Sequence, residues 1–304
     1  MNCRNRLVSI IITNYNYGCY VEDAIESALH QTYRPVEVIV VDDGSLDNSV
    51  EIVQQYPLTL ISREHEGFAA TVDAAIHASH GEYYVLLSAD DILHPEYVER
   101  AMSLLMKNPH AAFVYTASYL FDGISAILKS KKYDKRDLLR VNYVPATALV
   151  NKRAYLVTGG GYSAELPMLE DWDHWLSLAE NEFYGIYLPV PLLYYRRHRR
   201  NHRNLEREKR LGNRSFQVLC TTIEMITKKH RNLAPRYFLL IDLYYRVYRV
   251  LGNRLPMSIL NWARGMSLVR PEVSSPRFEF LDKRCCRLCA RGDACGDCSP
   301  GPCP

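Results

Sequence analysis

Over the first part of the chain, short apolar runs alternate with segments whose apolar residues recur at helical spacing. Four runs rich in β-branched side chains are predicted to be buried strands: residues 7–13, 36–41, 58–62 and 82–88. The segments between them are predicted to be helices: residues 20–31, 46–55 and 67–79. Because strands that alternate with helices form βαβ units, the pattern predicts an α/β fold with a mostly parallel sheet flanked by helices.

The pattern changes in the middle and at the end of the chain. Further strand-like runs occupy residues 111–117, 144–150 and 185–195, and residues 169–180 have the spacing of a helix. We therefore expect a main α/β domain over residues 1–204, which is large enough to be a catalytic domain, and a helical extension over residues 205–270. Residues 271–304 are rich in Pro, Ser, Gly and Cys and are predicted to form a loose tail.

Polar side chains follow three of the predicted strands at the point where each strand ends. Thr13–Tyr15 follow the first strand, Asp42 and Asp43 the second, and Ser88–Asp91 the fourth. Ligands of open α/β sheets bind beyond the carboxyl ends of the strands. We therefore expect these three stretches to form one polar site.

The adjacent acids Asp90 and Asp91 repel each other unless a cation or a hydrogen-bond donor lies beside them. Mg²⁺ and Mn²⁺ take one or two protein carboxylates and complete their shells with water and substrate phosphates. No glycine-rich phosphate loop follows the first strand, so a metal would have to neutralise bound phosphates. The alternative is that the two acids only start a turn and cap the next helix.

The chain has 304 residues, of which 48% are hydrophobic, which is enough for one sizeable core. No uncharged apolar segment approaches the roughly 20 residues of a membrane-spanning helix. The first residues lack a cleavage-site pattern and enter a strand at once. On these grounds we expect a cytoplasmic protein.

Basic residues gather in residues 196–250, which hold 15 Lys and Arg against 4 Asp and Glu, although the whole chain carries a net charge of only +3. Such a segment suits an anionic partner such as phosphate, nucleic acid or a membrane surface. A solvated helical face is the alternative. Within it, residues 236–250 are amphipathic, which is compatible with an anionic membrane surface or with packing against the main domain.

Six of the nine cysteines lie in the last 20 residues and include two C-x₂-C steps, Cys286/Cys289 and Cys295/Cys298. Zinc ribbons place roughly 15–20 residues between such steps. Only five residues separate them here, so an adventitious tail is favoured over a metal site.

Several motifs occur in the order TNYNYG, VVDDGS, LSADD, LEDWDHW and YYRRHRRNH between residues 7 and 202. This order resembles glycosyltransferase family 2, whose members have the GT-A fold. The resemblance implies transfer of a sugar from a nucleoside-diphosphate sugar, with inversion at the anomeric carbon and with Mg²⁺ or Mn²⁺ as cofactor. A UDP-sugar is the favoured donor, and the acceptor is a glycan or a lipid-linked glycan in surface polysaccharide or glycolipid synthesis.

The resemblance also implies roles for individual residues. Asp171, preceded by Glu170, matches the catalytic base, and Asp90 with His198 matches the metal ligands. The residues that match the nucleotide-sugar site are Thr13, Tyr15, Asp42, Asp43, Ser88, Asp90 and Asp91. We expect no nucleic acid partner, and we expect peripheral contact with an anionic membrane through residues 196–250. Trp172 and Trp175 either stack on the acceptor sugar or belong to the core.

The sequence departs from the family pattern at three places. Ser88 replaces the first acid of the DxD motif, Val72 and Asp73 replace an Arg-Asn pair, and His65 stands where Asn is common. These departures keep open an alternative in which the chain is a catalytically impaired relative that binds a sugar nucleotide or serves as a partner subunit. A nucleotidyltransferase is disfavoured because residues 13–18 lack a glycine-rich signature.

Overall fold

The computed structural model describes residues 6–123, 125–139, 142–160, 162–166, 169–198, 225–226 and 228–233. Most of the predicted extension, including residues 236–250, lies outside the described residues, as do the tail from residue 271 and its cysteines. In the part that is described, no helix has the length and apolar character needed to cross a membrane.

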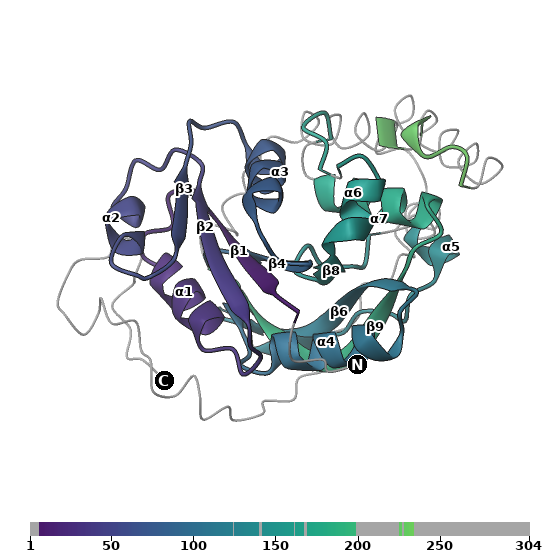
Figure 1. The fold of residues 1–304 in the computed structure, drawn as a ribbon, viewed down its shortest axis with the longest axis horizontal. Helices are drawn as coiled ribbons and strands as arrows, with labels where there is room; N and C mark the ends of the chain where they lie inside the picture. The colour runs from purple at the N-terminus through teal and green to yellow at the C-terminus, as the bar shows by residue number, and fades with distance from the viewer. Residues whose placement is uncertain are drawn as a thin grey trace, which may run out of the picture.

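The described strands form one mixed sheet in the order β3-β2-β1-β4-β8-β6-β9-β5, with β7 paired to β6. The part of this order from β3 to β9 can be followed in Figure 1. Strands β1 to β4 are parallel, β8 and β5 run antiparallel to their neighbours, and β6 is parallel to β9. The strands are β1 Val8–Asn14, β2 Val36–Asp42, β3 Thr59–Ser62, β4 Tyr83–Ser88, β5 Ile92–Leu93, β6 Ala111–Phe121, β7 Ala126–Leu128, β8 Leu149–Asn151 and β9 Tyr184–Arg196.

Helices cover both faces of this sheet (Figure 1). Successive side chains of a strand point to opposite faces, so Ile10 and Ile12 pack with α1 and α4 while Ile11 packs with α3, α6 and α7. The helices are α1 Val21–Leu29, α2 Ser49–Val53, α3 Phe68–Ala78, α4 Tyr97–Lys107, α5 Lys135–Leu138, α6 Lys152–Val157 and α7 Glu170–Glu180. The predicted α/β architecture of a sheet flanked by helices is confirmed.

The strand register brings the predicted polar residues to one edge of the sheet. β1 lies between β2 and β4, with Asn14 beside Asp42 and Thr13 beside Ser88. Because these three strands are parallel, their carboxyl ends meet at the same edge. The three polar stretches predicted from the strand ends therefore lie at the same edge of the sheet.

Two predicted elements are markedly shorter in the structure, and two short strands, β5 and the three-residue β7, were missed. The helix predicted over residues 46–55 begins only at Ser49, because the Asp47 carboxylate accepts hydrogen bonds from the backbone N–H groups of Gly18 and Ser49 and holds a turn there. The strand predicted over residues 144–150 begins only at Leu149. The two-residue strand β5, which pairs with β9, has too short an apolar run to be predicted.

Candidate active site

The carboxylate of Asp42, at the end of β2, is hydrogen-bonded to neighbouring residues of the protein. Its carboxylate accepts hydrogen bonds from Asn14 Nδ2 at 2.6 Å, Ser45 Oγ at 2.5 Å and the Ser45 backbone N–H at 2.9 Å. Asp42 is buried, as is Asn14. The side chain therefore fixes the loop that follows β2, and its partner Asn14 lies in the predicted polar stretch Thr13–Tyr15, where the sequence analysis gave it no role of its own.

Asp43, the next residue, joins that loop to the segment before α3. Its carboxylate accepts hydrogen bonds from the backbone N–H groups of Glu66 at 3.0 Å and Gly67 at 3.1 Å, and it lies 2.8 Å from Nδ1 of His65. The His65 ring stacks on Tyr15 with 4.2 Å between ring centroids. Tyr15 remains 40% exposed. The arrangement is a flat aromatic pair beside a carboxylate, which is a suitable surface for a nucleobase.

Asp90 and His198 meet although 108 residues separate them in the chain. Oδ2 of Asp90 lies 3.0 Å from Nε2 of His198, and both side chains are buried. The His198 ring stacks on Tyr20 at 4.8 Å between centroids and meets Tyr17 edge-on at 5.8 Å. The residues predicted as metal ligands are therefore brought together, held by two tyrosines that the sequence analysis did not select.

Asp91 points to a different partner, the buried Arg196 at the end of β9. The backbone N–H of Arg196 donates to Asp91 Oδ1 at 2.9 Å, and Nε of Arg196 donates to the Asp90 carbonyl at 2.9 Å. The guanidinium also reaches Asp23 at 2.7 Å and Asp122 at 3.4 Å. Burial, followed by the charge of Asp90, raises the pKa of Asp91 well above its usual range. Arg196 is therefore a buried structural cation that fixes the loop after β4.

Asp171 lies in the first turn of α7 and is half-buried. Its Oδ2 accepts a hydrogen bond from Asn142 Nδ2 at 2.8 Å, and its Oδ1 accepts one from the Trp172 backbone N–H at 2.8 Å. Burial raises the pKa of the Asp171 carboxyl, while these hydrogen bonds oppose the increase. Glu170 begins α7 and is partly buried. Asn142, in an irregular segment, gave no signal in the sequence.

The two tryptophans of α7 belong to the core. Trp172 and Trp175 are buried, and their indole N–H groups donate to the carbonyls of Leu138 at 2.8 Å and Val144 at 3.2 Å. An indole that is buried with its N–H satisfied has no face left for an acceptor sugar. Of the two interpretations left open by the sequence, the structure supports core packing.

Two further polar groups of α7 are fully buried. Nε2 of His174 lies 3.3 Å from the Tyr84 hydroxyl. Asp173 binds two residues from a distant part of the chain: Oδ1 lies 2.7 Å from His230 Nε2, and Oδ2 lies 2.7 Å from Lys229 Nζ. Burial lowers the pKa of His174 to about 3, with Asp173 acting in the opposite direction.

The sequence motifs and the assembled strand ends agree with the comparison to known families. The family described as Glycosyl transferase family 2 matches residues 9–161, which contain the ends of β1, β2 and β4. The chain belongs to glycosyltransferase family 2. The matched range includes Asp42, Asp90 and Asn142, whereas Asp171 and His198 lie beyond it.

Relatives of this family 2 chain include an uncharacterized glycosyltransferase and a chondroitin synthase. An uncharacterized glycosyltransferase of Rickettsia conorii is 31% identical over 193 residues, or 59% of this chain and 32% of the relative. The chondroitin synthase of Escherichia coli is 29% identical over 183 residues, or 57% of this chain and 26% of the relative. In both comparisons the match spans well under half of the curated relative's length.

Solved structures of similar fold include two that contain a bound nucleotide or nucleotide sugar. Residues 1–349 of S. aureus TarS in complex with UDP align with a TM-score of 0.54 at 16% identity, over 76% of this chain and 71% of TarS. The mannosyltransferase PcManGT from Pyrobaculum calidifontis, in complex with GDP-Man and Mn²⁺, aligns with a TM-score of 0.55 at 18% identity, over 86% and 81% of the two chains. These likenesses establish the GT-A fold for the family 2 chain.

Asp90 and His198 are the two described side chains that would hold the metal predicted for the family 2 site. Adjacent ligands of an octahedral ion bound at roughly 2.1 Å lie about 3 Å apart, which agrees with the 3.0 Å between Asp90 Oδ2 and His198 Nε2. No group of three or more His, Cys, Asp or Glu side chains suited to a metal occurs among the described residues. The donor set therefore fits an ion that takes two protein ligands and completes its shell with water and substrate phosphates.

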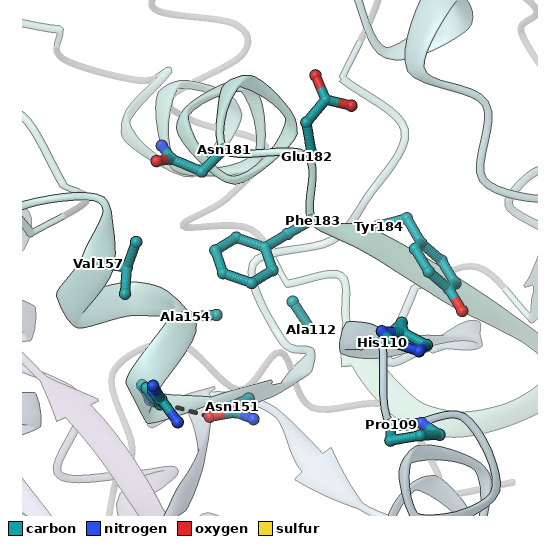
Figure 2. Close-up of a pocket in the computed structure, with 12 residues that line it drawn as sticks. Pro109, His110, Ala112, Asn151, Ala154, Val157, Asn181, Glu182, Phe183 and Tyr184 are labelled. Carbon is teal, nitrogen blue, oxygen red and sulfur yellow. Dashed lines mark hydrogen bonds between the residues drawn. The ribbon is translucent and has the colours of Figure 1, made fainter.

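A cavity of 430 Å³ lies elsewhere on the family 2 domain, where Asn151 ends β8 and Tyr184 begins β9 (Figure 2). Asn151 is beside Tyr83, the first residue of β4, whereas the acids follow Ser88, the last. One β4 length of about 17 Å therefore separates this cavity from the active-site edge. None of the described buried polar atoms that lack a partner lies in it.

Proposed function

We propose that this family 2 chain is an inverting glycosyltransferase that uses a nucleoside-diphosphate sugar, with a UDP-sugar favoured. The acceptor is a hydroxyl of a glycan or lipid-linked glycan in surface polysaccharide or glycolipid synthesis. The observation that carries the proposal is the contact of buried Asp90 with buried His198 at the carboxyl edge of the sheet. Relatives named chondroitin synthase and hyaluronan synthase, and neighbours in complex with UDP-GlcNAc and GDP-Man, support this donor and product class.

In this proposal Tyr15 and His65 hold the nucleobase, and Asp43 accepts a hydrogen bond from it. Asp42 acts indirectly, since its hydrogen bonds to Asn14 and Ser45 fix the loop that shapes this part of the site. Asp90 and His198 would hold Mg²⁺ or Mn²⁺. That ion, when bound, supplies the positive charge that neutralises the leaving diphosphate.

Asp171 is the proposed general base. Its carboxylate accepts the proton of the acceptor hydroxyl while that oxygen bonds to the anomeric carbon and the bond from that carbon to the diphosphate oxygen breaks. A single displacement of this kind inverts the anomeric configuration. The raised pKa of Asp171 supports the role, because it brings the carboxyl closer to the pH at which a base is most effective.

The proposal is tested with Asp90→Asn and Asp171→Asn, each compared with Asp137→Asn. Asp137 is the control, because it is a partly exposed carboxylate whose ion-pair partner is Lys131 at 3.7 Å. Release of UDP from UDP-sugars is measured with a panel of glycan acceptors, and thermal midpoints verify that each variant folds. We expect a loss of at least about 100-fold for Asp171→Asn, which is the lower range for removal of a general base. We also expect reduced transfer for Asp90→Asn, because a proposed metal ligand is removed. Full transfer by both would refute the assigned roles.

A second candidate is a sugar-nucleotide-binding subunit without turnover, and Ser88 favours it because the hydroxyl brings no charge to the first DxD position. The wild-type protein decides between the candidates. Turnover of a sugar nucleotide by the purified chain alone supports the enzyme. Binding of the nucleotide without turnover, over the whole acceptor panel, supports the subunit.

A further inference from the structure

Asn142 is the side chain that contacts the proposed base. Its Nδ2 donates to Asp171 Oδ2 at 2.8 Å, whereas Asp171 Oδ1 accepts from the Trp172 backbone N–H at 2.8 Å. The Trp172 donor belongs to α7 itself and follows from the helix geometry. The Asn142 donor comes from 29 residues earlier in the chain, so another segment must be held in place to supply it.

The orientation of the Asn142 amide is fixed by a second hydrogen bond. Its Oδ1 accepts from the backbone N–H of Val144 at 3.3 Å, which is the local turn that asparagine side chains commonly form. An amide has one acceptor end and one donor end. Because Val144 supplies a donor, the acceptor end is assigned to that side and the NH₂ end must face Asp171.

α7 itself anchors the segment on both sides of Asn142. The indole of Trp172 donates to the Leu138 carbonyl at 2.8 Å, and the indole of Trp175 donates to the Val144 carbonyl at 3.2 Å. Both indoles are buried. The helix that carries Asp171 therefore also holds the segment that supplies the Asp171 hydrogen bond, which keeps the two side chains in a constant relation.

We propose that Asn142 is a positioning residue that orients the Asp171 carboxylate toward the acceptor hydroxyl and favours its ionised form. The inference rests on the proposed role of Asp171. Asparagine suits the task because its NH₂ group donates a hydrogen bond and does not titrate. The hydrogen bond favours the charged carboxylate and opposes the effect of burial on its pKa. Among the described residues, Tyr162 is the titratable side chain whose electrostatic interaction with Asp171 is resolved.

The inference predicts the behaviour of Asn142→Ala and Asn142→Ser. Serine cannot reach Asp171 as the amide does, but its hydroxyl can still accept from the Val144 N–H and preserve the turn. In both variants the Asp171 titration midpoint should rise by roughly one pH unit, because a hydrogen bond to a charged group is lost. Turnover below the new midpoint should fall about tenfold. KM for the donor should stay unchanged, because Asn142 contacts the proposed base and none of the residues proposed to hold the donor.

The midpoint is measured by NMR titration of ¹³C-labelled aspartate carboxyl groups, with Asp171→Asn identifying the resonance. Asn181→Ala is the matched control, since Asn181 donates to the Ser177 carbonyl at the other end of the same helix. The control should retain the wild-type midpoint and pH–rate profile. Asn142→Ser tests the contact if Asn142→Ala does not fold.

An unchanged Asp171 midpoint in a folded Asn142 variant would overturn the inference. So would a midpoint that rises equally in Asn181→Ala. These outcomes are distinct from failure of the proposed function, which is shown by full transfer in Asp171→Asn whatever the NMR titration gives. If the Asp171 midpoint rises and the acid limb of the pH–rate profile moves to the same higher pH, the result would support both the proposed function and the positioning role of Asn142.

Discussion

His174 provides a test of the buried packing around α7, the helix that carries the proposed base Asp171. Its ring is completely buried on α7, stacks on Tyr162 at 5.0 Å between centroids and lies against Tyr84. Burial lowers its pKa to about 3 from an ordinary value of 6.5. The folded protein therefore keeps His174 neutral at a pH where the unfolded chain binds a proton.

The sign and size of the effect follow from linkage. Because the folded pKa lies below the unfolded pKa, the unfolded state takes up the extra proton, and stability falls as the pH drops below 6.5. Between pH 7.5 and pH 5, this single group should lower the free energy of unfolding by about 2 kcal/mol. The figure does not depend on the exact folded pKa, provided that it stays below about 4.

The assay is urea unfolding followed by tryptophan fluorescence at pH 7.5 and pH 5, with wild type compared with His174→Phe. The variant removes the titrating group, so the difference in stability between it and wild type should change by about 2 kcal/mol between the two pH values. His110→Gln is the control, because His110 is exposed. The reasoning is refuted if His174→Phe and wild type lose equal stability on acidification.

Three further predictions concern other parts of the domain. Replacing Arg196 by Leu should lower the free energy of unfolding by roughly 2–3 kcal/mol in urea titrations, because the Asp90 carbonyl, Asp23 and Asp122 lose their partner; no change would mean that these contacts are not formed in solution. Gly81→Ala should lower it by at least about 2 kcal/mol, since the new Cβ would lie 2.7 Å from a backbone nitrogen, and a wild-type urea midpoint would contradict this packing. UDP at a hundredfold excess over Kd should stabilise the protein by about 2.7 kcal/mol in thermal-shift assays with Mn²⁺, and equal stabilisation with EDTA would contradict a metal-bridged diphosphate.

The strands that carry the site were predictable because their signals are local. The runs that became β1, β2 and β4 are continuous, apolar and closed by polar residues, so both the strands and their ends agree with the structure. The parallel arrangement then placed Asp42 and Asp90 at one edge, as the general rule for such sheets requires. For these residues, sequence spacing and topology were sufficient.

The residues that support the acids were not predictable in the same way. Asn142 and Arg196 act through contacts that span 29 and 105 residues, and neither lies in a pattern with a fixed period. Val144 reads as part of a strand, yet its carbonyl accepts from Trp175, and β8 starts only at Leu149. Such competition between strand pairing and side-chain hydrogen bonds is decided by tertiary packing, which a single sequence does not contain.

The contact of Asp173 with His230 and Lys229 has a consequence for synthesis of the chain. The buried carboxylate is made 56 and 57 residues before the Lys229 and His230 side chains that it binds. At translation rates of roughly 5–20 residues per second, those partners follow about 3–11 seconds later. During that interval α7 carries a carboxylate whose final partners do not yet exist. The contacts of Asp173 must therefore wait until residues 229 and 230 have been synthesised.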